Sequence, residues 1–176
     1  MAIKNSKGFT IFFAMLVGGL ALAIGLAIYD LTVRELDLSA TATQSQYAIY
    51  AADAGAECAL YWDFKCTASN CGAGSAFASS TSNKTNGNGT PFPPTSGISC
   101  NSVDIAAAST ISNRTVSSAT TVFTFSIPSG GPQTYCATVT IAKSGTPTQT
   151  TVTSKGYNTC TSGGMTKLER VLQVTY

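Results

Sequence analysis

The residues with the most evident chemistry are six cysteines, all of which follow residue 57. An even number of cysteines in a short, polar, loop-rich region is typical of disulfides formed in an oxidising compartment. A zinc site is the competing interpretation, because Cys66 and Cys71 have an admissible ligand spacing. The chain has no second close pair and no histidine to complete a tetrahedral site. Disulfides are therefore favoured over a metal, and no cofactor is expected.

Other reactive side chains are present, but not in a catalytic arrangement. The absence of histidine removes the commonest general base. Serine and threonine hydroxyls are abundant, but Lys143 and Lys155, which could activate them, are expected at ordinary strand edges. Asp53 and Glu57 lie four residues apart on one helix face, a spacing that would suit a pair of catalytic carboxylates. The favoured interpretation of these two carboxylates is a polar helix face or an ion pair with a strand lysine. The sequence therefore predicts that the protein is not an enzyme.

The charge balance argues against a nucleic-acid partner. Ten Lys and Arg stand against eight Asp and Glu, which gives a formal net charge of +2. The basic residues are scattered singly rather than clustered on one segment, so the electrostatic footprint of a nucleic-acid-binding protein is missing.

The elements that position these residues begin with an uncharged apolar run, Phe9–Ile28, after a short basic start that contains Lys4 and Lys7. Twenty helical residues rise about 30 Å, the thickness of the hydrocarbon core of a bilayer. Basic residues before the run and Asp30 after it predict a cytoplasmic N-terminus, with the remainder outside. A secretory signal peptide, a permanent anchor and a prepilin all begin in this way.

Helical periodicity continues beyond the apolar run, which favours one long helix from about Phe9 to about Trp62, roughly 80 Å in length. The first half is apolar all round, and the second half is amphipathic. The expected apolar stripe consists of Leu31, Leu38, Ala42, Ser45, Ile49, Ala52, Ala56 and Leu60.

Beyond the helix, residues 63–120 are rich in Ser, Thr, Gly and Asn and are expected to form a variable loop region. Residues 121–176 alternate apolar and polar side chains and are expected to form an antiparallel sheet of about four strands. The predicted fold class is α+β, with the sheet packed on the second half of the helix. The expected strands are Thr121–Pro128, Gln133–Ala142, Thr148–Tyr157 and Leu168–Tyr176.

These elements suggest one of the fifteen possible disulfide connectivities, although sequence alone excludes none of the others. Cys136 and Cys160 would bridge neighbouring strands. Cys58, at the helix end, would hold the returning loop through Cys100. The remaining pair, Cys66–Cys71, would close a small loop.

Three stretches resemble the type IV pilin-like proteins. Lys7-Gly8-Phe9-Thr10 before an apolar helix resembles the prepilin cleavage site of a class III signal peptide. The segment Tyr47–Glu57 (YAIYAADAGAE) resembles the A-A-[DE]-A-G stretch of PilX-like pilins, and residues 156–160 and 168–176 resemble their closing strands. The resemblance covers the first 62 residues well and the last 20 loosely, and it fits a PilX-like minor pilin or a pseudopilin.

The resemblance implies that residues 1–8 are a leader, which a prepilin peptidase removes between Gly8 and Phe9, and that Phe9 is then N-methylated. It also implies that residues 9–29 serve first as a transmembrane helix and later as the filament-core helix, with residues 30–62 as the amphipathic helix of the globular domain. The implied core residues are Phe9, Phe12, Phe13, Leu16, Leu20, Ile24 and Ile28.

The resemblance further implies the partners and the location. Other pilin subunits, the prepilin peptidase, the pilus assembly machinery and, before assembly, the membrane are the expected partners. The chain would be a single-pass membrane protein with a cytoplasmic N-terminus and would then become part of an extracellular pilus on the cell surface. The main subunits of the family carry glutamate at the fifth mature position, which here is Phe13, and this departure favours a minor or tip subunit. The alternative is a membrane-anchored extracellular adhesion or binding domain that does not polymerise.

Overall fold

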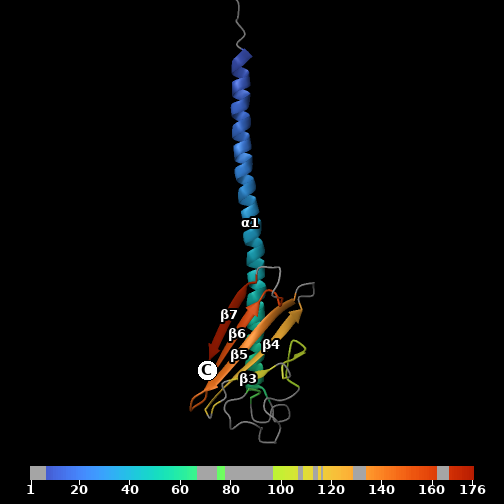
Figure 1. Cartoon of the computed structure of the whole chain (residues 1–176), viewed down its shortest axis with the longest axis vertical. Coiled ribbons are helices and arrows are strands. Elements are labelled where there is room, and N and C mark those ends of the chain that lie inside the picture. Colours follow the sequence, from blue (N-terminus) through green and yellow to red (C-terminus); the bar gives the residue numbers. More distant parts are fainter. Residues whose placement is uncertain are drawn as a thin grey trace, which may run out of the picture. The chain divides into compact units, whose positions relative to one another are not determined.

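The computed structural model describes residues 7–66, 75–77, 97–106, 109–112, 115, 117–128, 134–161 and 167–176. The chain divides into two compact units, Met1–Thr43 and Gln44–Tyr176. One helix, α1 (Lys7–Phe64), contributes to both units (Figure 1). The predicted single long helix is confirmed, and each end lies two residues outside the expected bounds.

The second unit contains a five-stranded antiparallel sheet in the order β3-β4-β5-β6-β7 (Figure 1). A separate two-stranded ribbon joins β1 (Ser99–Cys100) to β2 (Val103–Asp104). The predicted α+β class is therefore confirmed. The strands of the larger sheet are β3 (Thr110–Ser112), β4 (Ser118–Pro128), β5 (Thr134–Ser144), β6 (Gln149–Tyr157) and β7 (Glu169–Thr175).

The sheet has one strand more than the sequence predicts. The region 63–120, which we expected to be a loop region, contributes β1, β2 and the additional strand β3. Each is two or three residues long, too short for an apolar–polar alternation to be visible. β3 forms because Ile111 pairs with Thr121 at the edge of β4. Residues 67–74 and 78–96 of this region, and residues 1–6 of the expected leader, lie outside the described residues.

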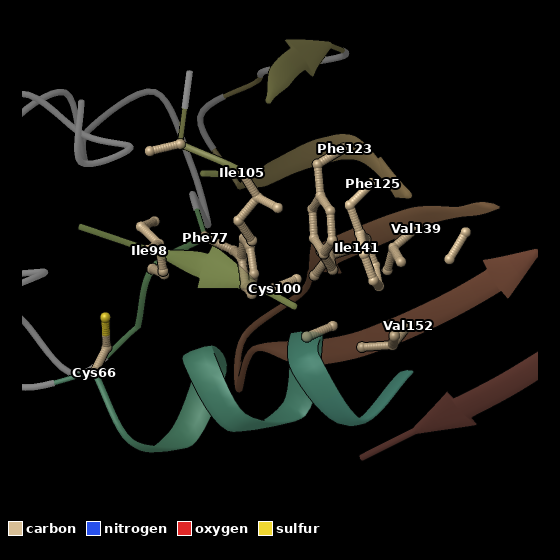
Figure 2. Close-up of a cluster of buried hydrophobic side chains, with 14 residues drawn as sticks. Cys66, Phe77, Ile98, Cys100, Ile105, Phe123, Phe125, Val139, Ile141 and Val152 are labelled. Carbon is tan, nitrogen blue, oxygen red and sulfur yellow. The ribbon is translucent and has the colours of Figure 1, made fainter. Parts of the chain in front are cut away.

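The alternating strands form because one face of the sheet is buried. Phe123 on β4 lies opposite Val139 on β5, and both side chains are almost fully buried. Ile141 on β5 lies opposite Val152 on β6 in the same layer. Figure 2 shows these side chains gathered between the strands and the helix. The ring of Phe77 stacks on Phe123 at a centroid distance of 5.8 Å, so the chain that follows the helix also closes this core.

The helix packs on the sheet through its smallest residues. A Cβ atom at Gly156 of β6 would overlap the backbone of Ala48 and Ala52, and a Cβ at Gly55 of α1 would lie 2.9 Å from Val139. The helix backbone therefore lies directly on the sheet, with no space for larger side chains between them. The helix residues buried before Asp63 are Ala48, Ala51, Ala52, Gly55, Ala56 and Ala59.

This close approach corrects part of the expected stripe. Ile49 is 45% exposed, and Leu31 and Leu38 are more than half exposed. Ala52 and Ala56 of the expected stripe are buried, as predicted. The stripe also included larger apolar side chains, whereas the helix residues packed against the sheet are alanine and glycine.

Candidate functional site

The apolar first part of α1 is exposed along its whole length. Its side chains have no partner among the described residues of the chain, and a contiguous apolar surface of this size marks an interaction surface. By length and composition, α1 could cross a membrane. The expected filament-core residues have exposed fractions of 72% (Phe9), 65% (Phe12), 58% (Phe13), 52% (Leu16), 60% (Leu20), 53% (Ile24) and 57% (Ile28).

The expected cleavage junction lies at the very start of this helix. α1 begins at Lys7, so the bond between Gly8 and Phe9 is in its first turn. Within the apolar part, a Cβ atom added at Gly18, Gly19 or Gly25 would meet nothing within 4 Å. These glycines therefore leave open surface, which permits close approach of another helix.

A buried polar cluster lies near the end of α1 in the second unit. The ammonium group of Lys143 on β5 is paired with the carboxylate of Asp63, and both side chains are less than 10% exposed. The hydroxyl of Ser75 also donates to Asp63 and accepts from the Lys143 Nζ at 2.9 Å. The other Asp63 oxygen accepts from the Tyr176 hydroxyl at 2.6 Å. Burial first, and then the hydrogen bond to Asp63 and its charge, raise the pKa of Tyr176 well above its ordinary value.

This cluster joins a serine to a lysine, an arrangement that can be nucleophilic, but its bonds favour a structural role. A serine nucleophile needs a neighbouring base with a free lone pair, and the Lys143 ammonium is committed to the Asp63 carboxylate. The Ser75 hydroxyl is further occupied by the backbone N–H of Phe77 at 3.0 Å. The cluster therefore ties the end of the helix, the sheet and the segment at Ser75 together.

Lys143 was expected at an ordinary strand edge, and that interpretation is wrong. β5 is the central strand of the sheet, and Lys143 is only 7% exposed. The signal was present in the sequence, because Lys143 continues the alternation that puts Val139 and Ile141 on the buried face. Asp63 and Ser75 were missed because nothing in their spacing connects them to Lys143.

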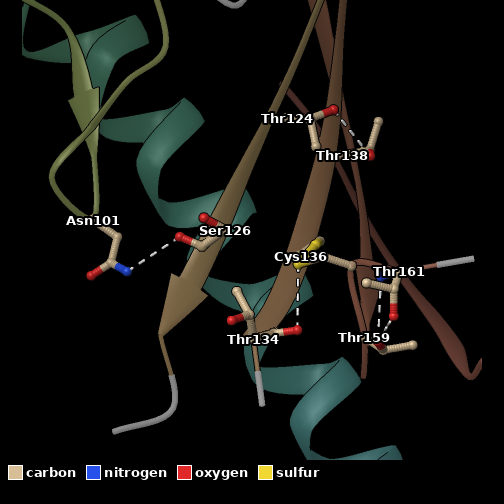
Figure 3. The surroundings of a disulfide bond; sticks show 9 residues. Asn101, Thr124, Ser126, Thr134, Cys136, Thr138, Thr159 and Thr161 are labelled. Atoms are coloured by element: carbon tan, nitrogen blue, oxygen red, sulfur yellow. Dashed lines mark hydrogen bonds between the residues drawn. A yellow bond between two sulfur atoms is a disulfide. The ribbon is translucent and has the colours of Figure 1, made fainter. Parts of the chain in front are cut away.

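Two disulfides lie in the described part of the chain. Cys58 on α1 is bonded to Cys100 on β1, with their Cα atoms 5.9 Å apart. Cys136 on β5 is bonded to Cys160, which follows β6, with a Cα–Cα distance of 5.3 Å (Figure 3). These are two of the three expected pairs. Cys66 is also disulfide-bonded, while Cys71, the partner expected for it, lies outside the described residues.

A surface groove of about 410 Å³ lies beside the first of these disulfides. The helix contributes Glu57, Tyr61 and Trp62 to its lining, and the turn after β1 contributes Asn101. The indole nitrogen of Trp62 donates to the carbonyl of Ser99 at 3.0 Å, which fixes the ring against β1. Tyr61 is 57% exposed, so its ring remains accessible.

The two carboxylates weighed as a catalytic pair lie on this side of the helix. Asp53 and Glu57 are both exposed, and neither forms an ion pair within the described residues. An ion pair with a strand lysine was one expected arrangement, but Lys143 is paired with Asp63 and Lys155 with Glu169. Across the described ranges, no group of three His, Cys, Asp or Glu side chains could hold a metal ion.

Basic side chains lie on both faces of the sheet at its β6–β7 end. Lys155 pairs with Glu169 at 3.4 Å, and the Lys167 Nζ lies 4.1 Å from the centre of the Tyr157 ring. Arg170 bonds the Ser45 hydroxyl of α1 through two guanidinium nitrogens, at 2.9 and 2.6 Å. A hydrogen bond from Tyr157, followed by the effect of Lys155, lowers the pKa of Glu169 despite an opposing effect of desolvation.

Comparison of the chain with family models, with curated proteins and with solved structures found no match.

Proposed function

We propose that this chain is a structural subunit of a type IV pilus or a related pilus-like filament, and that it is a minor or tip subunit. The observation that carries the proposal is the fully exposed apolar part of α1, which follows Lys7-Gly8-Phe9-Thr10 and continues without a break into a disulfide-linked α+β unit. The apolar surface needs a non-aqueous environment, and the continuous helix leads directly from that surface into the folded unit.

The proposed cycle has two environments for the same residues. Before assembly, lipid surrounds residues 9–29 and the N-terminus is cytoplasmic. After a prepilin peptidase cuts between Gly8 and Phe9 and Phe9 is methylated, the pilus assembly machinery extracts the helix into the filament. Helices of neighbouring subunits then replace the lipid, so the apolar side chains stay out of water in both states.

Mass spectrometry of the purified full chain tests this function. The expected N-terminus is N-methylated Phe9. An intact Met1 would instead support a permanently anchored extracellular binding domain, and a start near residue 24 would indicate a cut secretory signal peptide. Either result would remove the pilin proposal.

A pair of leader variants separates loss of peptidase recognition from a general loss of protein expression. Gly8→Leu should abolish cleavage, because the resemblance places the glycine directly before the cut, while Ala2→Leu in the same leader should leave cleavage unchanged. Equal processing of both variants would contradict the assigned junction.

A further inference from the structure

The outward face of α1 in the second unit carries an uncompensated negative charge. Asp53 and Glu57 are four residues apart on the helix, and like charges at this spacing destabilise a helix by about 0.2–0.5 kcal/mol. Neither carboxylate is paired within the described residues. The fold itself therefore gives no reason for this pair of charges.

The groove beside Glu57 has the chemistry of a cation site. A carboxylate and two aromatic side chains, Tyr61 and Trp62, line the same hollow. Their rings meet edge to face with centroids 5.3 Å apart. Ammonium and guanidinium groups bind both to carboxylates and to the faces of such rings. Because the Trp62 nitrogen is already bonded to Ser99, its ring is held in place before any ligand arrives.

The same chain carries a surface with the opposite charge. Lys155 and Lys167 are exposed on the outer face of the sheet at the β6–β7 end, beside Glu169, with which Lys155 is paired at 3.4 Å. Arg170 pairs with Gly156 and lies on the opposite face, bonded to Ser45 of α1. Of the other exposed cations with described side chains, Arg34 is paired with Asp30 at 3.2 Å, and Lys65 directly follows the helix that lines the groove. Lys155 and Lys167 are therefore the two neighbouring cations that can meet the groove of another copy.

We propose that the groove at Glu57, Tyr61 and Trp62 binds the basic β6–β7 end of a second copy of this chain. The inference rests on the proposed function and deepens it by naming a contact between subunits. The two surfaces are different parts of the molecule, so the contact is head-to-tail. A head-to-tail contact that does not close into a ring propagates into an open helical assembly. Opposite charges on the two surfaces also fix which surfaces meet.

Carbodiimide cross-linking of the full chain in detergent tests the contact directly. This reagent joins a carboxylate to a nearby amine, so it reports Asp53 or Glu57 lying against Lys155 or Lys167. Copies labelled with ¹⁵N are mixed with unlabelled copies, because a cross-linked peptide pair of mixed label must come from two molecules. Mixed-label pairs joining these residues are expected. Their absence, or mixed-label pairs that join the carboxylates to Lys65 instead, would overturn the proposal.

Charge-swap variants make the test specific. Glu57→Lys and Lys167→Glu should each lower the mixed-label yield by about tenfold or more, because like charges brought together across an interface cost several kcal/mol. The double variant should restore the yield, since the pair is then reversed but still opposite. Glu35→Lys, at an exposed helix acid outside the second unit, is the matched control and should have no effect. Equal loss in the control, or no rescue in the double variant, would contradict the contact.

Thiol labelling and the N-terminal mass separate the possible causes of a lost cross-link. Resistance to thiol labelling without reductant verifies that Cys58–Cys100 is intact in each variant, so an unfolded variant is not mistaken for a broken contact. Cross-linking in detergent does not require a filament. A start at Phe9 without the cross-link would remove this inference alone, whereas a cross-link in a chain with intact Met1 would remove the filament proposal alone.

Discussion

Three polar contacts converge on the buried carboxylate of Asp63. Both of its carboxylate oxygens are used, one by Lys143 and Ser75 and the other by Tyr176. A buried ion pair contributes little net stability over apolar residues of the same shape, but the loss of one partner leaves an uncompensated buried charge. Each member of the cluster is therefore costly to remove alone.

Lys143→Met should destabilise the fold by about 3–5 kcal/mol, because Asp63 is left charged and buried. Urea unfolding of the full chain in detergent, followed by the fluorescence of the single tryptophan, measures the change in free energy. The double variant Asp63→Leu with Lys143→Met should recover most of the loss. Lys155→Met removes an exposed pair and should cost less than about 1 kcal/mol. A double variant less stable than Lys143→Met would contradict the paired-charge account.

Tyr176 should make stability depend on pH in the alkaline range. Its pKa is raised in the folded state, so the folded protein holds this proton more tightly than the unfolded chain does. The contribution is complete below the unfolded pKa of about 10 and is lost as the pH rises toward the folded pKa. Stability should therefore fall between about pH 10 and pH 12, and less steeply in Tyr176→Phe. Tyr157, whose pKa is also raised, mainly by burial, will keep part of the dependence. Urea unfolding at several pH values measures both slopes, and identical slopes would contradict the assignment.

Among the elements, the contact of α1 with β6 depends on the absence of side-chain atoms. Gly156→Ala should destabilise the second unit by about 3 kcal/mol or more, because the new methyl group overlaps the helix backbone, which cannot rotate away as a side chain could. Gly18→Ala is the matched control, since the methyl group there meets nothing within 4 Å. Unfolding in urea compares the two variants, and a Gly156→Ala variant as stable as the control would show that the helix can move off the sheet.

The same contact explains how far the sequence predicts the fold. The strands β4, β5 and β6 follow from periodicity, because each has one face buried over many residues. The long helix and β7 were predicted from their own sequence patterns, although in β7 only Leu172 is partly buried. Strand β3 does not follow from periodicity, since its three residues are stabilised by pairing with β4 rather than by their own pattern. The buried face of α1 was misplaced at Ile49 because closeness to Gly156 favours alanine over larger apolar residues.

The apolar surface could be predicted from the sequence, whereas the groove and the Asp63 cluster could not. The apolar surface from Phe9 to Ile28 is a property of local composition and was visible in the sequence. The groove was not, because it forms only where the Cys58–Cys100 bond places β1 against the last turns of α1. The Asp63 cluster likewise depends on a contact across 80 residues.

For the whole molecule, if the chain is a filament subunit as proposed, Phe13 determines which position in the filament it can take. The resemblance implies that a glutamate at this position pairs with the charged N-terminus of a neighbouring subunit. Phe13→Glu should therefore allow incorporation along the shaft, whereas the wild type should be rare and near a tip. Phe12→Glu places the same charge one residue away and is the matched control. Immunogold labelling of sheared filaments measures the distribution, and dense, even decoration by the wild type would contradict the argument.

The Cys58–Cys100 bond has a mechanical consequence for any subunit that is pulled by its helix. The bond spans 42 residues of sequence, which when fully extended would measure about 140 Å. With the bond intact, tension on α1 reaches β1 without drawing out that length of chain, even after the alanine face has slipped from the sheet. The Cys136–Cys160 bond, with a separation of 24 residues, likewise prevents extension of a loop whose length would be roughly 80 Å. Under load, the oxidised protein should therefore behave as a short tether, and reduction should turn it into a long, compliant one.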